Sequence, residues 1–272
     1  SGSSDKTIKV WDLKSGSEKF TLTGHSSYVN TVAITPDGQS VISGSSDKTI
    51  KVWDLKSGSE KFTLTGHSSY VNTVAITPDG EYMISGSDDK TIKFWDLKSS
   101  RKKFTFTAHG KSVNAVAITP DNEYVISGSD DRTIKVWDLK SSRKKLTLTG
   151  HNSWVNVVAI TPDGQSVISG LSNKTIKVWD LKSGSEKFTL SGHSGGVNAV
   201  VVPFYIPYLI SGSDDKTIKV WDLKSREEIA TFTGDSPILC CAIAPDGKTI
   251  VAGEASGRLH FLWWEGRGGN YE

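Results

Sequence analysis

Short apolar runs alternate with polar turns along the chain. In one stretch, four runs of seven or eight residues rich in β-branched side chains occupy residues 28–35, 39–45, 49–55 and 60–66. Turn-forming residues separate them: Pro36-Asp37-Gly38, Ser46-Asp47-Lys48 and Lys56-Ser57-Gly58. Runs of this length and composition are typical of strands, and no segment has the 3.6-residue period of an amphipathic helix. The pattern predicts a four-stranded antiparallel meander.

This meander repeats along the sequence. The segment that opens SGSSDKTIKVWD at Ser1 returns, with small changes, every 42 residues, and a degenerate copy begins at Ala252. The intact copies begin at Ser1, Ser43, Ser85, Ser127, Ser169 and Ser211. Residues 1–38 and 43–80 are identical, which indicates recent copying or engineering, because packing does not constrain surface positions.

The repeat predicts the fold class. A four-stranded sheet with apolar residues on both faces needs a neighbour on each side, and radial stacking of identical sheets supplies both. We therefore expect an all-β protein, a β-propeller of four-stranded antiparallel blades that forms a single domain over residues 1–272. Seven units with incomplete terminal blades are favoured. Six-bladed closure is the alternative, in which the first outer strand, residues 19–23, joins the last three strands.

Composition narrows the class of protein. The net charge is +2 at pH 7, which does not favour nucleic acid as a partner. The longest apolar stretch, residues 200–210, is interrupted by prolines and too short to span a bilayer, so no membrane is expected. The first residues lack the apolar core of a signal peptide. The two cysteines, Cys240 and Cys241, are adjacent and do not form a disulfide framework, which favours a reducing compartment such as the cytoplasm.

The recurring Gly-His and Trp-Asp pairs resemble the WD-repeat β-propeller family. Gly24-His25 is followed after about 28 residues by Trp53-Asp54, and six Trp-Asp pairs stand in register over the whole chain. The resemblance implies a buried hydrogen-bonded tetrad of His, Ser, Asp and Trp in each unit. The implied tetrads are His25, Ser43, Asp47 and Trp53; His67, Ser85, Asp89 and Trp95; His109, Ser127, Asp131 and Trp137; His151, Ser169, Asn173 and Trp179; and His193, Ser211, Asp215 and Trp221.

Two units depart from this tetrad. Asn173 replaces the aspartate, so the fourth set is expected to lose a charge-assisted hydrogen bond. The last unit has Asp235, Ala252 and Leu262 at three tetrad positions and is expected to have no tetrad.

A Ser-His-Asp set also occurs in hydrolases. Here it recurs in several units and is expected to be buried between sheets, without access for a substrate. The histidines are therefore interpreted as structural. Neither catalysis, nor a metal, nor a cofactor is expected, and an enzyme that uses the centre of the ring remains an alternative without a supporting motif.

Variation between units is concentrated in loops, where a binding function can be encoded. The resemblance implies that partners contact the residues three and five after each histidine and the residue before each tetrad aspartate. These partner-binding candidates are Tyr28, Tyr70, Trp154, Asn30, Asn72, Asn114, Asn156, Asn198, Asp88, Asp130 and Asp214. Together they predict an aromatic and acidic end that suits a basic or aromatic-anchored peptide. The alternative is that the asparagines cap bulges and the acids are solvated.

The opposite end carries two further departures. Phe204, Tyr205 and Tyr208 belong to an apolar turn that replaces Thr-Pro-Asp-Gly, and they are either a partner contact or packing against a terminal segment. Residues 101–103 and 143–145 read Arg-Lys-Lys where other units read Ser-Glu-Lys, and these six cations are expected to cluster. They would meet an acidic protein or phosphate, or remain a solvated surface.

The final 25 residues or so resemble the last unit of the WD-repeat arrays of bacterial signal-transduction NTPases. The chain contains no phosphate-binding loop of that class. The favoured function is a non-catalytic scaffold or sensor module in signalling that binds a protein or peptide. A structural or engineered repeat without a ligand is the alternative. Oligomerisation through unclosed terminal blades also remains open.

Overall fold

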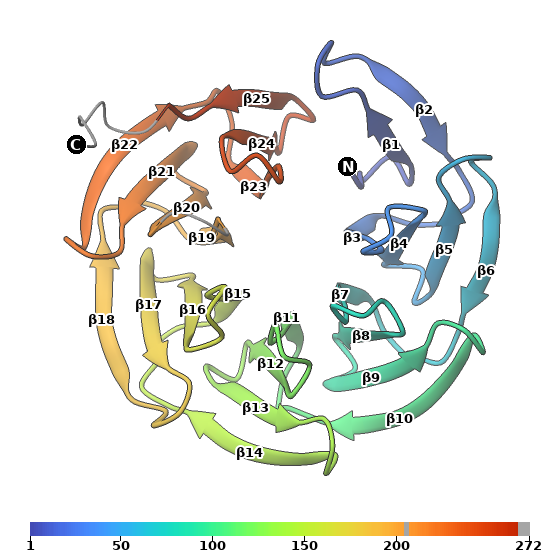
Figure 1. Cartoon of the computed structure of the whole chain (residues 1–272), viewed down its shortest axis with the longest axis horizontal. Helices are drawn as coiled ribbons and strands as arrows, with labels where there is room; N and C mark the ends of the chain where they lie inside the picture. The colour runs from blue at the N-terminus through green and yellow to red at the C-terminus, as the bar shows by residue number, and fades with distance from the viewer. Residues whose placement is uncertain (204–206, 266–272) are drawn as a thin grey trace.

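The chain forms a ring of antiparallel sheets around a central axis (Figure 1). The computed structural model describes residues 1–203 and 207–265, which contain 25 strands and no helix. The all-β propeller predicted from the repeat is therefore confirmed. Most of its blades are four-stranded antiparallel meanders.

Five blades are complete, and their strands follow one another from the axis to the rim. The first contains β3 (Val29–Ile34), β4 (Ser40–Ser45), β5 (Ile50–Asp54) and β6 (Glu60–Leu64). The second contains β7 (Val71–Ile76), β8 (Tyr82–Ser87), β9 (Thr91–Asp96) and β10 (Arg101–Thr107). The third contains β11 (Val113–Ile118), β12 (Tyr124–Ser129), β13 (Ile134–Asp138) and β14 (Arg143–Leu148). The fourth contains β15 (Val155–Ile160), β16 (Ser166–Leu171), β17 (Thr175–Asp180) and β18 (Glu186–Ser191). The fifth contains β19 (Val197–Val201), β20 (Tyr208–Ser213), β21 (Thr217–Asp222) and β22 (Glu227–Thr233).

The sixth blade has three strands: β23 (Ile238–Ile243), β24 (Thr249–Glu254) and β25 (Leu259–Trp263). Six blades match the six-bladed alternative, and a ring of seven blades is not confirmed. The remaining sheet is a two-stranded ribbon of β1 (Ile8–Trp11) and β2 (Glu18–Leu22), which lies between the sixth and first blades (Figure 1).

The ribbon corrects one detail of the six-bladed alternative. The first outer strand, β2, pairs with β1 and does not join the last three strands. The cause is local, because the turn after Asp12 returns the chain directly onto β1: Asp12 accepts hydrogen bonds from the amides of Lys14 and Ser15. Gly16 of this turn faces Phe261 of β25, and the ribbon thereby approaches the sixth blade.

Packing between blades explains the repeated apolar and glycine positions. One core cluster joins Ile50 and Val52 of the first blade to Val71 and Trp95 of the second. A Cβ on Gly44 would lie 2.6 Å from Val71 Cγ1, so only glycine lets the next blade approach this closely. The blades therefore stabilise one another through faces that none could bury alone.

The ribbon lacks the two inner strands of a complete blade, and this leaves apolar surface beside it. Val32 of β3 is 37% exposed, whereas its counterpart in the second blade, Val74, is 8% exposed. Leu239 of β23, on the other side of the ribbon, is also exposed. The described residues contain no helix long and apolar enough to cross a bilayer.

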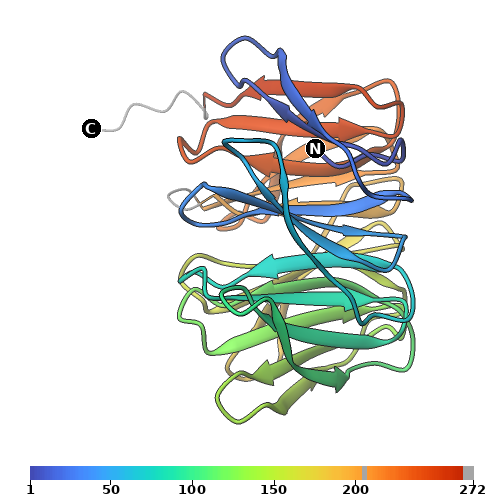
Figure 2. The ribbon, with the colours of Figure 1, turned by 90° about the vertical axis from the view of Figure 1, so that its right-hand side faces the viewer.

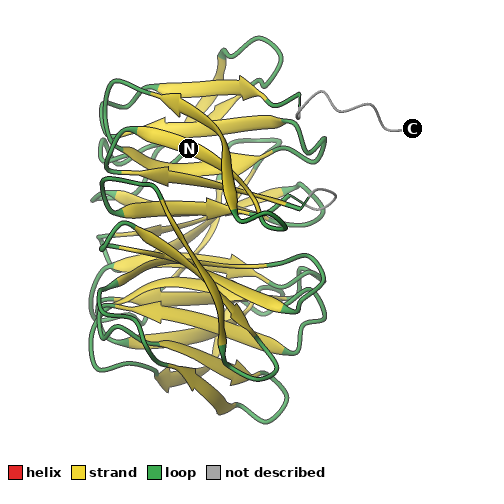
Figure 3. Cartoon of the chain, turned by 90° about the vertical axis from the view of Figure 1, so that its left-hand side faces the viewer, coloured by secondary structure: helices red, strands yellow, loops and turns green. Residues whose placement is uncertain are grey.

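Seen from the side, the ring is a disc with loops at both ends (Figures 2 and 3). The loops that precede the innermost strands and the turns that contain the tetrad aspartates lie at one end, which we call the histidine end. The turns after the innermost strands and before the outermost strands lie at the other, which we call the turn end. This assignment follows from the direction of the strands in each meander.

Candidate functional site

Four of the five expected tetrads are connected by hydrogen bonds. In the first blade, His25 Nδ1 lies 2.7 Å from Asp47, and His25 Nε2 lies 2.7 Å from Ser43 Oγ. The indole Nε1 of Trp53 donates to the same Ser43 Oγ at 2.8 Å. The second, third and fifth blades repeat this geometry within 0.2 Å. Their contacts join His67, Ser85, Asp89 and Trp95; His109, Ser127, Asp131 and Trp137; and His193, Ser211, Asp215 and Trp221.

These contacts determine the tautomer and the protonation state of the imidazole. The Asp47 carboxylate accepts, so His25 Nδ1 carries the proton, and Nε2 accepts from Ser43. Burial lowers the pKa of His25 although Asp47 opposes this, which keeps the ring neutral. Burial acts to raise the pKa of Asp47, but hydrogen bonds from Thr49, His25 and backbone amides outweigh it and lower that pKa to about 2.

This arrangement does not constitute a catalytic triad. In a hydrolase the histidine accepts a proton from a serine that reaches the substrate. Here Ser43 is fully buried and also accepts a hydrogen bond from Trp53. Within residues 1–203 and 207–265, no three His, Cys, Asp or Glu side chains gather in a way that could hold a metal ion.

The fourth blade departs from the others, as Asn173 predicts. His151 Nδ1 is buried and has no hydrogen-bond partner among the described residues, because the Asn173 amide donates to Asn152 instead. The His151 ring lies 3.3 Å from Ser169 Oγ and 4.6 Å from the Trp179 ring. Burial and the nearby Lys177 lower the pKa of His151 to about 4.

The last unit replaces the tetrad with a network that the sequence analysis missed. Buried Glu254 accepts hydrogen bonds from His260 Nε2 and from the amide of Asp235, each at 2.8 Å. Hydrogen bonds from Ser256 and His260 lower the pKa of Glu254 to about 2. The signal was present in the sequence: His260 is the one histidine outside the tetrad position, and Glu254 stands where other units have serine or leucine.

At the histidine end, the three aromatic candidates are exposed. Tyr28, Tyr70 and Trp154 are 56%, 49% and 51% exposed, each directly before an innermost strand. Their backbones are fixed, since the carbonyl of each accepts a hydrogen bond from a neighbouring turn amide at 2.9–3.1 Å. The aromatic side chains are thus held on rigid backbone.

The asparagine candidates connect neighbouring blades. The side-chain amide of Asn30 donates to the carbonyl of Val71 in the next blade at 3.0 Å. Asn72, Asn114, Asn156 and Asn198 make the equivalent contact. Asn72, Asn114 and Asn198 also donate, each at 2.7 Å, to the carboxylates of Asp88, Asp130 and Asp214. The amides therefore hold the three acidic side chains in place.

The turn end holds the remaining candidates. Tyr208 is half-buried at the start of β20 and packs edge to face on Trp264, with ring centroids 6.0 Å apart. Phe204 and Tyr205 lie outside the described residues. The cations of residues 101–103 and 143–145 are exposed on β10 and β14, the outer strands of adjacent blades.

Comparison with known proteins identifies the class. The family described as "WD domain, G-beta repeat" matches residues 16–54, 58–96, 100–138 and 142–180, which is more than half of the chain. The chain therefore belongs to the WD40-repeat family of β-propellers. A second family, "TEP-1 C-terminal beta-propeller", matches residues 193–264. WD40 propellers are in general non-catalytic folds that mediate protein–protein interactions.

The similar curated proteins share short segments with this chain. Nuclear distribution protein PAC1 of Mycosarcoma maydis is 50% identical over 42 residues, 15% of this chain and 9% of its own length. Small ribosomal subunit protein RACK1y of Oryza sativa subsp. japonica is 50% identical over 38 residues, 14% of this chain and 11% of its own length. Ribosome assembly protein 4 of Chaetomium thermophilum is 50% identical over 38 residues, 14% of this chain and 7% of its own length. The chain thus spans only about a tenth of these relatives.

Proposed function

We propose that the protein is a non-catalytic interaction scaffold that binds a protein or peptide at its histidine end. The observation that carries this proposal is the exposure of Tyr28, Tyr70 and Trp154 at equivalent positions of three blades. Large aromatic side chains on rigid backbone lose little conformational entropy on binding, which makes them effective anchors.

The charge of this end favours a basic partner. Asp88 and Asp130 occupy adjacent blades, Tyr70 shares a blade with Asp88, and Asp214 lies at the same position of the fifth blade. Carboxylates around aromatic anchors attract lysine- and arginine-rich segments and accelerate their association. We therefore propose a basic peptide segment with an aromatic or aliphatic anchor as the partner.

The names of the relatives are compatible with a scaffold, since they describe proteins of nuclear distribution and ribosome assembly. A role in signalling and a location in the cytoplasm are part of the same proposal. The two free cysteines, Cys240 and Cys241, support a reducing compartment.

A quantitative capture experiment tests this proposal. The triple variant Tyr28→Ala, Tyr70→Ala, Trp154→Ala and the wild type are immobilised, and proteins bound from a lysate of the source cells are counted by mass spectrometry. We expect at least tenfold lower recovery on the triple variant, because each anchor is worth about 2 kcal/mol or more. Trp263→Ala is the matched control, since Trp263 is equally exposed but lies on β25.

A second variant separates charge from aromatic contact. Asp88→Asn, Asp130→Asn and Asp214→Asn keep a side-chain oxygen for the asparagine partner but remove three negative charges. The bound fraction should fall, most strongly at low ionic strength. Equal recovery on wild type and both triple variants would refute binding at the histidine end.

A further inference from the structure

Three of the complete blades bind a carboxylate of their own outer strand in the same way. In the first blade one oxygen of Glu60 accepts a hydrogen bond from Lys51 Nζ at 2.7 Å, and the other oxygen accepts from Thr63 Oγ1. Lys51 Nζ also donates to Thr63 Oγ1 at 2.8 Å. The fourth and fifth blades repeat this arrangement with Lys177, Thr189 and Glu186 and with Lys219, Thr231 and Glu228.

The second blade keeps the lysine and the threonine but lacks the carboxylate. Lys93 and Thr105 pair across β9 and β10, and Lys102 stands opposite Trp95, which is the position of the glutamate in the three other blades. Lys93 is 6% exposed and makes one hydrogen bond, to Thr105 Oγ1 at 3.3 Å. An ammonium group has three protons to donate and a threonine hydroxyl has one, so most of these donors lack an acceptor among the described residues.

The third blade has the same substitution but satisfies its lysine in another way. Lys144 stands at the glutamate position, yet Lys135 Nζ donates to the backbone carbonyl of Ala108 at 2.6 Å. Loss of the glutamate therefore does not by itself leave the buried ammonium without an acceptor. Because a buried charge without a partner is costly, Lys93 of the second blade calls for an acceptor from outside its blade.

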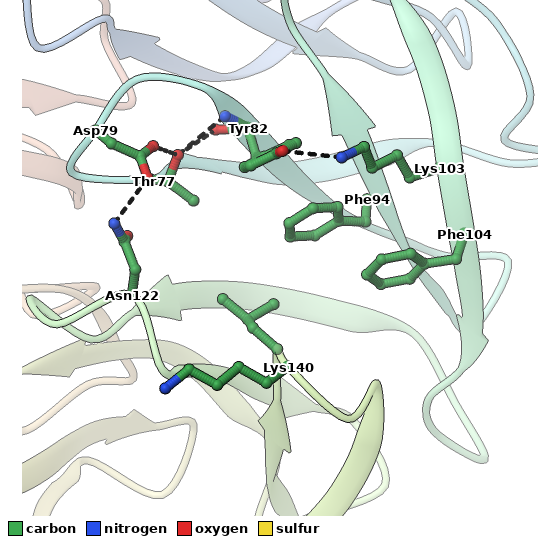
Figure 4. Close-up of a pocket in the computed structure, with 9 residues that line it drawn as sticks. Thr77, Asp79, Tyr82, Phe94, Lys103, Phe104, Asn122 and Lys140 are labelled. Carbon is green, nitrogen blue, oxygen red and sulfur yellow. Dashed lines mark hydrogen bonds between the residues drawn. The ribbon is translucent and has the colours of Figure 1, made fainter.

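A pocket between the second and third blades is a different place (Figure 4). Phe94 lines it, and since neighbouring side chains of a strand point to opposite faces, Lys93 lies on the other face of the blade. The two lysines that line the pocket, Lys103 and Lys140, each have a carboxylate partner, at 3.7 Å and 3.2 Å. The unsatisfied cation is therefore not in this pocket.

Solvent reaches the position that the missing carboxylate would occupy. The glutamates that occupy it in the first, fourth and fifth blades are each 34% exposed. In the first blade, Glu60 Oε2 lies 3.6 Å from the place where Gly24 would carry a Cβ. At the equivalent place on Gly66, the Trp95 ring is the only group of the described residues within 4 Å. A ligand can therefore enter here from solution.

The electrostatics of this position favour an anion. Burial lowers the pKa of Lys93, and the nearby Lys102 lowers it further. Asp89 acts in the opposite direction, but its carboxylate already accepts hydrogen bonds from His67 and Thr91. A carboxylate bound beside Lys93 would offset the repulsion between the two lysines.

We infer that this position of the second blade is a binding site for one external carboxylate, which takes the place of the glutamate of the other blades. One oxygen of the ligand accepts from Lys93 Nζ and the other from Thr105 Oγ1, and Lys102 adds a second positive charge. The ligand is a small free carboxylate or an acidic side chain of a partner protein. The site uses none of the aromatic side chains of the histidine end and stands independently of the proposed function.

An NMR titration of the full chain tests this inference. The probes are sodium acetate and the peptide acetyl-Gly-Glu-Gly-amide, with ionic strength held constant by sodium chloride, and the signals followed are the Lys93 ammonium and the Thr105 amide. We expect these signals to shift and saturate with a dissociation constant on the order of 1 mM, because a few charge-assisted hydrogen bonds hold a partly solvated ligand. The pKa of Lys93 should rise in saturating acetate.

The two probes distinguish the sources of the carboxylate. Saturation by acetate alone assigns the site to a small free carboxylate. Saturation by the peptide, with or without acetate, assigns it to an acidic side chain of a partner.

Matched variants locate the site. Lys102→Glu supplies the glutamate of the other blades and should weaken acetate binding about tenfold or more, and the fold is retained because three blades already contain this residue. Thr105→Val removes one donor and should weaken binding about threefold or more. Lys144→Glu makes the same change of charge in the third blade, where Lys135 has its carbonyl acceptor, and should bind acetate as wild type.

Three results would overturn the inference. Signals of Lys93 and Thr105 that do not respond to either probe would show that water satisfies these donors. Equal weakening by Lys102→Glu and Lys144→Glu would show that net charge and not this site attracts the anion. Tighter binding of phosphate than of either probe would show that the site does not select a carboxylate.

Discussion

Replacing Asn173 with aspartate should stabilise the protein, because the fourth blade is the one complete blade whose tetrad is broken. In the four intact tetrads the histidine Nδ1 lies 2.7–2.8 Å from a carboxylate oxygen. His151 Nδ1 has no partner among the described residues and is buried. The prediction is that Asn173→Asp supplies the missing acceptor.

The magnitude follows from the cost of an unpaired buried polar group. Leaving such a group without a partner costs about 1–3 kcal/mol, and a hydrogen bond to a charged acceptor is among the stronger ones. We expect a gain of about 1–3 kcal/mol in the free energy of unfolding. For a chain of this size that corresponds to roughly 2–10 °C in Tm. The double variant Asn152→Ser with Asn173→Asp restores the residues of the first and second blades at both positions and should gain at least as much.

The pH dependence gives an independent check with a defined sign. The pKa of His151 is lowered from 6.5 to about 4 in the folded state, so below pH 6.5 the unfolded chain binds a proton that the folded chain refuses. The wild type therefore loses stability, on the order of 3 kcal/mol, as the pH falls from 6.5 towards 4. A carboxylate beside the ring raises this pKa, so the advantage of Asn173→Asp should grow between pH 8 and pH 5.

Urea unfolding of wild type and variants at pH 8 and pH 5, followed by tryptophan fluorescence, measures both effects. Asp47→Asn in the first blade is the reverse control and should cost about 1–3 kcal/mol. A variant Asn173→Asp that is no more stable than wild type, or whose advantage shrinks at pH 5, would refute the structural role assigned to the tetrad.

Three further results are expected. Lys102→Glu should raise the free energy of unfolding by about 1–2 kcal/mol near pH 7, because the new carboxylate gives Lys93 a partner. Burial lowers the pKa of Lys93, so the wild type recovers stability as the pH rises through that pKa towards 10.5. The gain of the variant, measured by urea unfolding, should therefore shrink over that pH range. Gly44→Ala should cost about 1–3 kcal/mol in the same assay, because its Cβ would lie 2.6 Å from Val71 Cγ1, and an unchanged midpoint would contradict the close packing of blades. Of all the strands, β1, β2 and β25 should show the fastest amide hydrogen exchange by mass spectrometry, because they belong to the two incomplete sheets. Equal protection of β1 and β13 would contradict this order.

Much of the fold can be predicted from the sequence because the strands and turns of each blade are determined by residues that are close together in the chain. Each strand of the first blade lies within two residues of the predicted run, since the turns Pro36-Asp37-Gly38 and Lys56-Ser57-Gly58 define its limits. The tetrad geometry follows from the family resemblance, and the absence of a His151–Asn173 contact follows from one substitution. Because each unit has the same pattern of strands and turns, one unit supports the structure predicted for the others.

Closure of the ring could not be predicted because it depends on contacts between the chain ends, where the repeat is incomplete. Gly16 of the ribbon lies close to Phe261, which belongs to a strand far away in the sequence. The pocket between the second and third blades could not be predicted either, because Phe94 and Asn122, which line it, belong to different blades and become neighbours only in the ring. The destabilisation caused by Lys102 could not be predicted either. It depends on the buried Lys93 of the neighbouring strand, which has no glutamate opposite it in this blade.

Long-range proton–nitrogen NMR of the imidazole rings distinguishes a structural role of the histidines from a reactive one. His25, His67, His109 and His193 should each carry the proton on Nδ1 and remain neutral near pH 7, with titration midpoints below 6.5. A ring among these four that carries its proton on Nε2, or that takes up a second proton near pH 7, would contradict that role.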